Sequence, residues 1–224
     1  MKKLFLLLLP ALVARPLFAQ KDADARLEAA TDVMNEMMKA SDKGIPQDLL
    51  SKADCVVVVP NLKKGGFIVG AKYGKGFFSC RKHSGIGWSA PASIRIEGGS
   101  FGLLIGGAET DVIMLVMNRK GADSLLSSKF TLGGDASAAA GPVGRDSSAQ
   151  TDAMMRAEIL TYSRSRGIFG GISLEGSTLR PDEDSNKELY GREITNKDIV
   201  MGSVTTPAAA HGFIADLNKY SSRK

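Results

Sequence analysis

Hydrophobic residues near the N-terminus recur every three or four positions, with charged residues between them. This spacing predicts an amphipathic helix over residues 23–43, which Gly44 and Pro46 end, followed by a short helical turn at residues 47–52. The apolar stripe of the long helix is rich in methionine and comprises Leu27, Ala30, Met34, Met37 and Met38. Residues 24–43 carry five acidic and three basic side chains. Because membrane-surface helices usually have basic polar faces, we expect this stripe to pack in the core rather than to insert in lipid.

The middle of the chain has the pattern of β-structure. Residues 55–59 form a continuous β-branched run closed by Pro60, which is typical of a buried strand. Between residues 65 and 117, short apolar runs alternate with glycines, which indicates antiparallel strands joined by turns. These runs are 67–69, 77–78, 94–96, 101–105 and 112–117. Two further runs, 157–163 and 168–174, predict a hairpin around Arg166 and Gly167.

Helical patterns return toward the C-terminus. Residues 119–128 predict a short helix, and residues 181–190 a charged loop or short helix. A closing helix is expected from Thr206 to Tyr220, because Pro207 suits its first position and its apolar residues share one face. No clean linker divides the chain. We therefore expect one α+β domain: an antiparallel β-rich core, either a sandwich or an open barrel, with an N-terminal and a C-terminal helix packed on it.

The first residues of the chain are patterned as an export signal. Lys2 and Lys3 precede an apolar run, which Pro10 and Arg15 interrupt, and Ala19 supplies a small residue at the cleavage position. The run is too short to span a bilayer stably, although an N-terminal membrane anchor is the alternative interpretation. We expect residues 1–19 to be a signal peptide and residues 20–224 to form a single exported domain, periplasmic or extracellular.

Loss of a signal peptide changes the charge balance. The whole chain has a formal charge of +5, and removing the three cations of the signal lowers it to +2. A strongly polycationic nucleic-acid binder is therefore not indicated. The 43% hydrophobic and 24% charged residues exclude a disordered or fibrous chain. Two histidines and two cysteines leave no room for a His-rich zinc or haem cluster, so we expect no cofactor and no metal.

Two glycine-rich segments resemble loops of enzymes. Residues 98–102 match the G-x-S-x-G elbow of hydrolases, and Asp111 and His211 follow Ser100 in the order of a catalytic triad. The elbow requires a helix after the serine, whereas another β run follows here, so we favour a glycine-rich turn. Residues 85–90 match a dinucleotide-binding loop only loosely, because Pro91 stands where a helix would run. We expect no enzymatic activity.

The two cysteines, Cys55 and Cys80, are 25 positions apart. In an oxidising compartment two cysteines often pair, and such a loop would stabilise the fold by roughly 3 kcal/mol. The alternative is two buried thiols on neighbouring strands, because cysteine is commonly buried. The sequence leaves both possibilities open.

The segment 61–82, which we call the basic segment, is the most distinctive candidate surface. It contains no Asp or Glu and six cations: Lys63, Lys64, Lys72, Lys75, Arg81 and Lys82. Aromatic residues are interleaved with them. Each cation near an anionic lipid surface contributes about 1 kcal/mol, so the segment suits a membrane. The alternative is a pair of solvated strands whose lysines face water while the aromatics fill the core.

Several motifs, spread from about residue 25 to 221, resemble the SYLF domain, also called the Ysc84 actin-binding domain family. They are Gly66-Phe67-Ile68-Val69-Gly70, Tyr73-Gly74-Lys75-Gly76, Gly87-Trp88-Ser89-Ala90-Pro91-Ala92, Ile96-Glu97-Gly98-Gly99-Ser100-Phe101-Gly102, Thr110-Asp111-Val112, Phe130-Thr131-Leu132-Gly133, Ala140-Gly141-Pro142-Val143-Gly144-Arg145, Tyr162-Ser163-Arg164-Ser165-Arg166-Gly167 and Ser173-Leu174-Glu175-Gly176.

This resemblance implies a lipid-binding module. Eukaryotic members of the family bind phosphoinositides and some bind actin filaments, whereas bacterial members are mostly exported proteins. We expect non-catalytic, peripheral binding to anionic phospholipid or phosphoinositide head groups in the cell envelope, with the six cations supplying the attraction. Actin binding is not expected of an exported chain. The alternative is a structural platform for an envelope protein partner.

Overall fold

The computed structural model describes residues 17–40, 44–66, 69–82, 86–101, 106–143, 156–165 and 168–221. The strands are β1 (Cys55–Gly66), β2 (Val69–Cys80), β3 (Ala92–Phe101), β4 (Gly106–Val116), β5 (Phe130–Thr131), β6 (Ala138–Ala140), β7 (Ile159–Ser165), β8 (Ile168–Gly171) and β9 (Thr178–Pro181). The helices are α1 (Leu17–Lys39), α2 (Gln47–Lys52), α3 (Arg119–Leu125), α5 (Glu183–Tyr190), α6 (Asn196–Met201), η2 (Ala208–Ala210) and α7 (His211–Tyr220).

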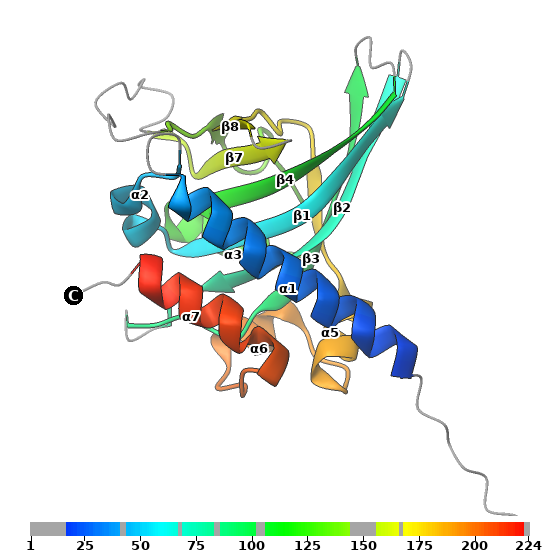
Figure 1. The fold of residues 1–224 in the computed structure, drawn as a ribbon, viewed down its shortest axis with the longest axis vertical. Helices are drawn as coiled ribbons and strands as arrows, with labels where there is room; N and C mark the ends of the chain where they lie inside the picture. Colours follow the sequence, from blue (N-terminus) through cyan, green and yellow to red (C-terminus); the bar gives the residue numbers. More distant parts are fainter. Residues whose placement is uncertain are drawn as a thin grey trace, which may run out of the picture.

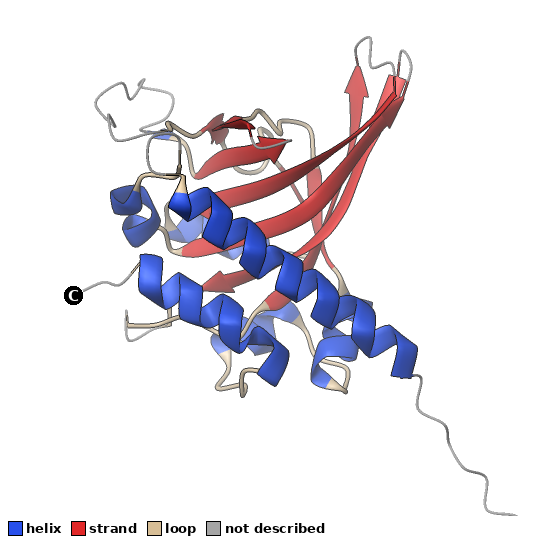
Figure 2. Cartoon of the chain, in the orientation of Figure 1, coloured by secondary structure: helices blue, strands red, loops and turns tan. Residues whose placement is uncertain are grey.

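These nine strands belong to one curled sheet (Figures 1 and 2). The strand order is β5-β9-β3-β2-β1-β4-β7-β6, and β8 pairs with β7. The pairs are antiparallel except that of β6 with β7. The predicted α+β class is therefore confirmed, and the core is a single open, curled sheet rather than a sandwich. The four long strands β1–β4 extend beyond the helices at the upper right of Figure 1; we call this region the hairpin end.

Each face of the sheet covers its own hydrophobic core. Strand β1 shows the division, because Val56 and Val58 belong to one core whereas Val57 and Val59 belong to the other. The first core is closed by α1, α2 and α7, and the second receives α3 and α6. We call the two sides of the sheet the α1 face and the α6 face.

The N-terminal helix α1 packs its apolar stripe into the core, as predicted. Leu27, Ala30 and Met34 are fully buried, and α1 crosses the sheet beside α7 (Figure 1). The helix begins at Leu17, earlier than predicted and inside the segment assigned to a signal peptide, and it ends at Lys39. No helix in the described ranges is long and apolar enough to cross a membrane.

Strand β1 continues past Pro60, so the prediction that this proline ends the strand is wrong. The register with β2 shifts between Val58 and Lys63, which marks a β-bulge. Asn61 lies in the bulge with a left-handed φ of 51°, and its N–H donates to Oδ1 of Asp111 at 2.9 Å. Because a bulge interrupts the ladder, a residue without an N–H is tolerated there.

The glycines predicted to separate short strands lie inside long ones instead. β2 runs unbroken over Gly74 and Gly76, and β3 over Gly98 and Gly99. At Gly76 a Cβ would overlap the carbonyl oxygen of Val58, so only glycine lets the bulged strand pass.

Of the other elements, some agree with the prediction, one is shorter than predicted and several were not predicted. The turn at residues 47–52 is α2, the hairpin is formed by β7 and β8, and the closing helix is η2 with α7. The predicted helix at residues 119–128 is shorter and ends at Leu125. The pattern did not predict α6 or the short strands β5, β6 and β9.

Candidate functional site

The structure does not gather the six cations of the basic segment into one patch. Lys72 and Cys80 lie near opposite ends of β2, about 25 Å apart at ordinary strand spacing. Lys63, Lys64 and Lys72 therefore belong to the hairpin end, whereas Arg81 and Lys82 follow the other end of β2 and Lys75 lies between. Their surroundings assign different roles to these three groups.

Lys75 forms an ion pair within the fold. Its ammonium pairs at 2.8 Å with Oδ2 of Asp182, whose side chain is only 1% exposed. Burial alone would raise the pKa of Asp182, but hydrogen bonds from Lys75 and Ser185 hold that pKa below its usual value. Asp182 precedes α5, so this ion pair attaches that helix to β2. A side chain committed in this way is not available to a membrane.

Arg81 is also committed to the fold. Its guanidinium donates to the backbone oxygens of Ala53, Ser51 and Ser221, the last at 2.6 Å, and lies 4.1 Å from the ring centroid of Trp88. The Trp88 indole N–H donates to the hydroxyl of Ser221 at 3.0 Å. We call Arg81, Trp88 and Ser221 the C-terminal anchor, because they tie the end of the described chain to β2.

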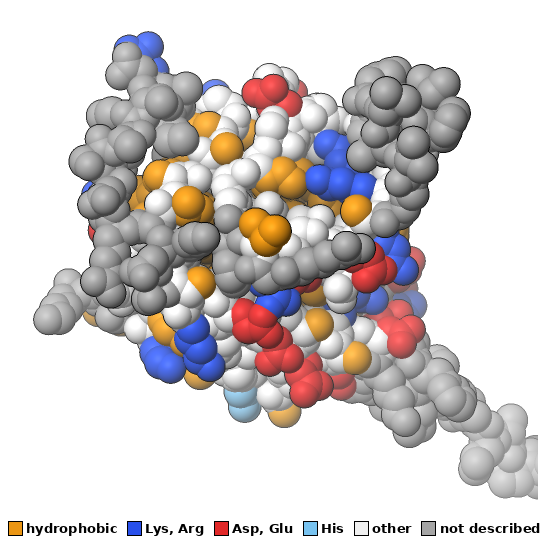
Figure 3. Space-filling view, turned by 45° about the horizontal axis from the view of Figure 1, so that its top comes forward, with side chains coloured by type: hydrophobic (Ala, Val, Ile, Leu, Met, Phe, Trp, Pro, Cys, Tyr) orange, Lys and Arg blue, Asp and Glu red, His pale blue; other side chains and the backbone are white. Residues whose placement is uncertain are grey.

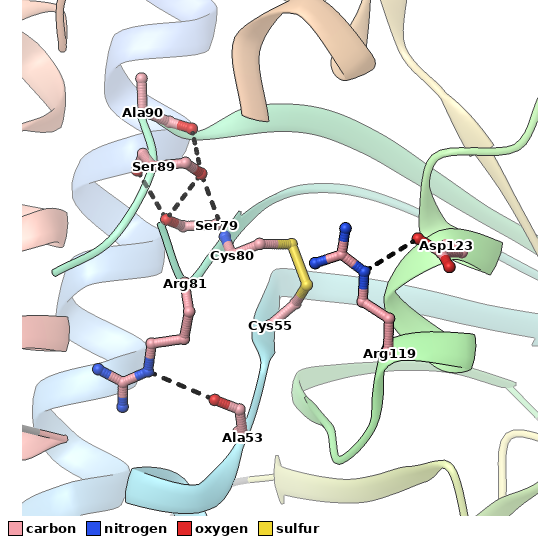
Figure 4. Close-up of a disulfide and its surroundings, with 9 residues drawn as sticks. All are labelled: Ala53, Cys55, Ser79, Cys80, Arg81, Ser89, Ala90, Arg119 and Asp123. Atoms are coloured by element: carbon pink, nitrogen blue, oxygen red, sulfur yellow. Dashed lines mark hydrogen bonds and ion pairs between the residues drawn. A yellow bond between two sulfur atoms is a disulfide. The ribbon is translucent and has the colours of Figure 1, made fainter. Parts of the chain in front are cut away.

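Cys55 and Cys80 are joined by a disulfide with an S–S distance of 2.01 Å (Figure 4). They are direct partners in the β1–β2 ladder. The bond lies between the Ser79–Ser89 hydrogen-bond cluster and the Arg119–Asp123 ion pair. A small pocket of about 220 Å³ borders it, lined in part by Arg81 and Lys82.

Lys64 and Lys72 form the remaining pair, directly opposite each other in the β1–β2 register. Both lie on the α6 face with Leu62, and Lys72 is only 8% exposed. Burial lowers the pKa of both amines, and the charge of Lys64 lowers that of Lys72 further. Within the described ranges neither ammonium has an acidic partner. A half-buried and a buried cation without a counter-ion among the described residues form a site suited to an external anion.

The floor around this lysine pair consists of small residues. By register, the neighbouring positions on the same face of the sheet are Gly66, Gly70, Gly98, Gly106 and Ala108. In Figure 3, which brings this end of the molecule forward, Lys and Arg side chains lie beside hydrophobic ones. Lys63 points to the opposite face, is exposed and lies 4.0 Å from Glu109. The two lysine side chains therefore border several positions that carry little or no side chain, with Leu62 next to Lys64 on the same face.

A partly buried charge network, which the sequence did not reveal, lies on the α1 face of the same strands. Arg164 of β7 donates two hydrogen bonds to Oδ2 of Asp111, at 2.9 and 2.6 Å, and also pairs with Glu36 of α1. The other oxygen of Asp111 accepts the N–H of Asn61 in the β-bulge. The network therefore connects α1, β7 and the bend below the hairpin end.

Ser100, Asp111 and His211, which follow the sequence order of a hydrolase triad, lie in surroundings that do not suit one. Ser100 lies inside β3, which continues to Phe101, so it does not stand where a helix begins. The carboxylate of Asp111 is bound by Arg164 and Asn61. His211 is exposed at the start of α7.

Replacing Lys72 with methionine should stabilise the fold by about 0.5 kcal/mol at pH 7, because it removes one of two like charges placed opposite across strands. The folded-state pKa of Lys72 lies below 10.5, so the penalty is full at neutral pH and vanishes as the pH rises past the unfolded-state value. Urea titrations at pH 7 and at about pH 11, above the unfolded-state pKa, measure this difference. The exposed Lys63, changed to methionine, is the control; an equal effect of both changes would contradict a specific lysine pair.

Comparison with known proteins identifies the family. The family model described as "Las17-binding protein actin regulator", Ysc84, matches residues 97–220. An SH3 domain-containing protein of Schizosaccharomyces pombe is 37% identical over 178 residues, which are 78% of this chain and 41% of that protein. SH3 domain-containing YSC84-like protein 1 of Rattus norvegicus is 34% identical over 183 residues, 81% of this chain and 53% of its own length.

LAS seventeen-binding protein 3 of Saccharomyces cerevisiae is 32% identical over 200 residues, 88% of this chain and 43% of that protein. This chain thus spans about half the length, or less, of the relatives that it matches. The matches cover most of the chain and confirm the resemblance drawn from its motifs. The chain belongs to the Ysc84 family.

Proposed function

We propose that this protein is a non-catalytic module that binds anionic phospholipid or phosphoinositide head groups, at the periphery of a membrane in the cell envelope. The observation that carries the proposal is the lysine pair at the hairpin end. Lys64 is half-buried and Lys72 is buried, and neither has an acidic partner among the described residues. An anionic head group would supply the missing counter-charge.

We propose that a few of the six cations of the basic segment supply the attraction, rather than all six. Lys75 and Arg81 bind other parts of the fold, as described above. Lys63, Lys64 and Lys72 remain at the hairpin end. Tyr73, 46% exposed, is the cross-strand partner of Lys63 and adds an amphipathic ring on the face opposite to Lys64 and Lys72. On the α6 face, Ile168 of β8 is 76% exposed and lies three strands along the sheet from Lys64. Cations flanked by exposed apolar side chains suit shallow contact with a bilayer surface.

A second candidate is a platform for a protein partner. Its support is the name of the yeast relative, which is a LAS seventeen-binding protein. For an exported chain the corresponding partner would be a protein of the envelope. Ionic strength separates the two candidates, because attraction to lipid charge weakens with salt whereas an apolar protein interface does not.

Co-sedimentation with liposomes tests the lipid proposal. The protein should pellet with anionic but not with neutral vesicles, and physiological salt should weaken binding relative to low salt. Changing Lys64 and Lys72 together to glutamine should weaken binding about 30-fold, since each cation contributes about 1 kcal/mol.

The matched control changes Lys52 and Lys187 to glutamine, which alters the net charge equally. Both control lysines are exposed and pair with acidic residues, at 3.9 and 2.9 Å, so their loss costs little stability. If the two double variants bind equally, the lysine pair is not the site. If the unchanged protein binds no vesicle, the lipid proposal is wrong and the protein-platform candidate takes its place.

A further inference from the structure

The disulfide between Cys55 and Cys80 borders a pocket on the α6 face of the sheet. Both cysteines line this pocket, together with residues of α3 and α6, and its volume is about 220 Å³. The two partners are not equally accessible, because Cys80 is 6% exposed whereas Cys55 is 0% exposed. A thiol that opens a disulfide must approach one of its two sulfurs. The pocket and the difference in exposure therefore make Cys80 the side from which this bond is attacked.

Cationic side chains outnumber carboxylates around this pocket. Three cations and two acids line it: Arg81, Lys82, Arg119, Asp54 and Asp123. Lys82 is exposed and has no ion pair within the described ranges. Arg119 pairs with Asp123 at 3.5 Å and is 63% exposed, and Figure 4 shows its side chain extending from α3 toward the disulfide. Because the attacking form of a thiol is the negatively charged thiolate, these cations favour its approach.

A second pocket, of about 430 Å³, adjoins the first. The two pockets share three lining residues, Lys82, Val200 and Met201. The pocket at the disulfide alone is smaller than the roughly 300–1,000 Å³ that ligand sites occupy, whereas the two together reach this range. Ser203 and Thr206 contribute hydroxyl groups to the second pocket. It therefore suits the polar part of a ligand whose sulfur lies at Cys80.

We propose that Cys80 is a modification site, at which a small thiol with carboxylate groups, of the class of glutathione, forms a mixed disulfide. The thiolate attacks Sγ of Cys80, and a new S–S bond forms there. The bond between Cys55 and Cys80 breaks, and Cys55 leaves with its electron pair as a thiolate that takes a proton from water. One disulfide replaces another, so the step needs no further oxidant or reductant. This inference goes beyond the proposed function and does not depend on it.

The β1–β2 ladder makes this modification reversible. Cys55 and Cys80 are direct partners in the ladder, with Cα atoms 4.0 Å apart. Just beyond them, the N–H of Arg81 donates to the carbonyl oxygen of Asp54 at 2.8 Å, so the backbone holds the two strands together without the disulfide. The released Cys55 thiol stays beside the mixed disulfide and expels the small thiol when it attacks in turn. A stable adduct on Cys80 therefore accumulates when Cys55 is removed.

The first test compares two single variants, Cys55→Ala and Cys80→Ala, each incubated with oxidised glutathione and followed by mass spectrometry. Both lack the disulfide, so they are matched for its loss, and each keeps one thiol. We expect Cys80 to gain one glutathione group about tenfold faster than Cys55 does, because only Cys80 is accessible in the folded chain. In denaturing urea the two rates should be equal. Equal rates in variants whose urea midpoints show them to be folded, or no adduct on Cys80, would overturn the site.

The second test uses the unchanged cysteines and so does not depend on the folding of a cysteine variant. Opening of the disulfide is followed by alkylation of the free thiols, with glutathione or with 2-mercaptoethanol, which has no carboxylate. Lys82→Gln should slow opening by glutathione about fivefold at low salt and opening by 2-mercaptoethanol by less, and physiological salt should reduce this difference.

The matched control is Lys52→Gln, because Lys52 is also exposed but pairs with Asp48 at 3.9 Å, and this change should slow neither thiol. Equal slowing of both thiols by Lys82→Gln would overturn the assignment to a thiol with carboxylate groups. If neither thiol opens the disulfide in the absence of urea, the pocket does not admit a thiol and Cys80 is not a modification site.

Discussion

Replacing Arg164 with methionine should lower the free energy of unfolding by about 3 kcal/mol, because the change leaves the carboxylate of Asp111 buried without its cation. The Asp111 side chain is only 12% exposed, and Arg164 supplies two of its hydrogen bonds. Methionine preserves most of the apolar length of the arginine, so the loss reports the charge network rather than a cavity. Urea unfolding followed by the fluorescence of Trp88, the single tryptophan, measures the effect.

The control for this prediction is Arg119→Met. Arg119 pairs with Asp123 at 3.5 Å, but both side chains are 63% exposed, so this change should cost less than about 1 kcal/mol. If Arg164→Met lowers the free energy of unfolding no more than Arg119→Met does, the network contributes no more stability than an exposed ion pair. Because the network also binds Asn61 at the bulge, we further expect Arg164→Met to weaken vesicle binding at the hairpin end.

Removing the disulfide should have an effect of similar size. The variant Cys55→Ala with Cys80→Ala should lose about 3.5 kcal/mol of stability in the chain-entropy model, since the bond closes a loop between residues 25 positions apart. Urea unfolding of the oxidised protein, with and without a reducing agent, provides the same comparison without mutation.

Reductant serves as the internal control for the disulfide. It should destabilise the unchanged protein and leave the double variant unaffected. If reductant and the double substitution both leave the midpoint of unfolding unchanged, the bond does not constrain the unfolded chain as the model assumes. Partial losses that differ between the two experiments would show that the cysteine side chains also contribute by packing.

The sequence predicted those parts of the fold that depend on local periodicity. The spacing of Leu27, Ala30 and Met34 was sufficient to place α1 and its buried face, since helical periodicity and core contact coincide there. The strand ends were predicted less well. Pro60 and Gly98 resemble breaks in a local pattern, yet the first lies in a bulge and the second beneath a lysine chain, and both circumstances depend on neighbouring strands.

The candidate site shows the same division between local and long-range information. The absence of acids from residues 61–82 singled out the basic segment, but the partners that remove Lys75 and Arg81 from it, Asp182 and Ser221, are over 100 positions away in sequence. Only the pairing of strands shows which two of the six cations stand together without a counter-charge in the described part of the chain.

The C-terminal anchor fixes the position of Ser221, the last described residue, relative to the hairpin end. Arg81 and Trp88 hold Ser221 at the disulfide end of β2, about 25 Å from Lys72 along that strand. A fusion partner or tag joined downstream of Ser221 would therefore emerge on the side remote from the hairpin end. If Lys64 and Lys72 contact a bilayer, a protein fused there would lie in the aqueous phase, away from the lipid. The module would then act as a spacer, with the hairpin end at the membrane and the disulfide end facing water.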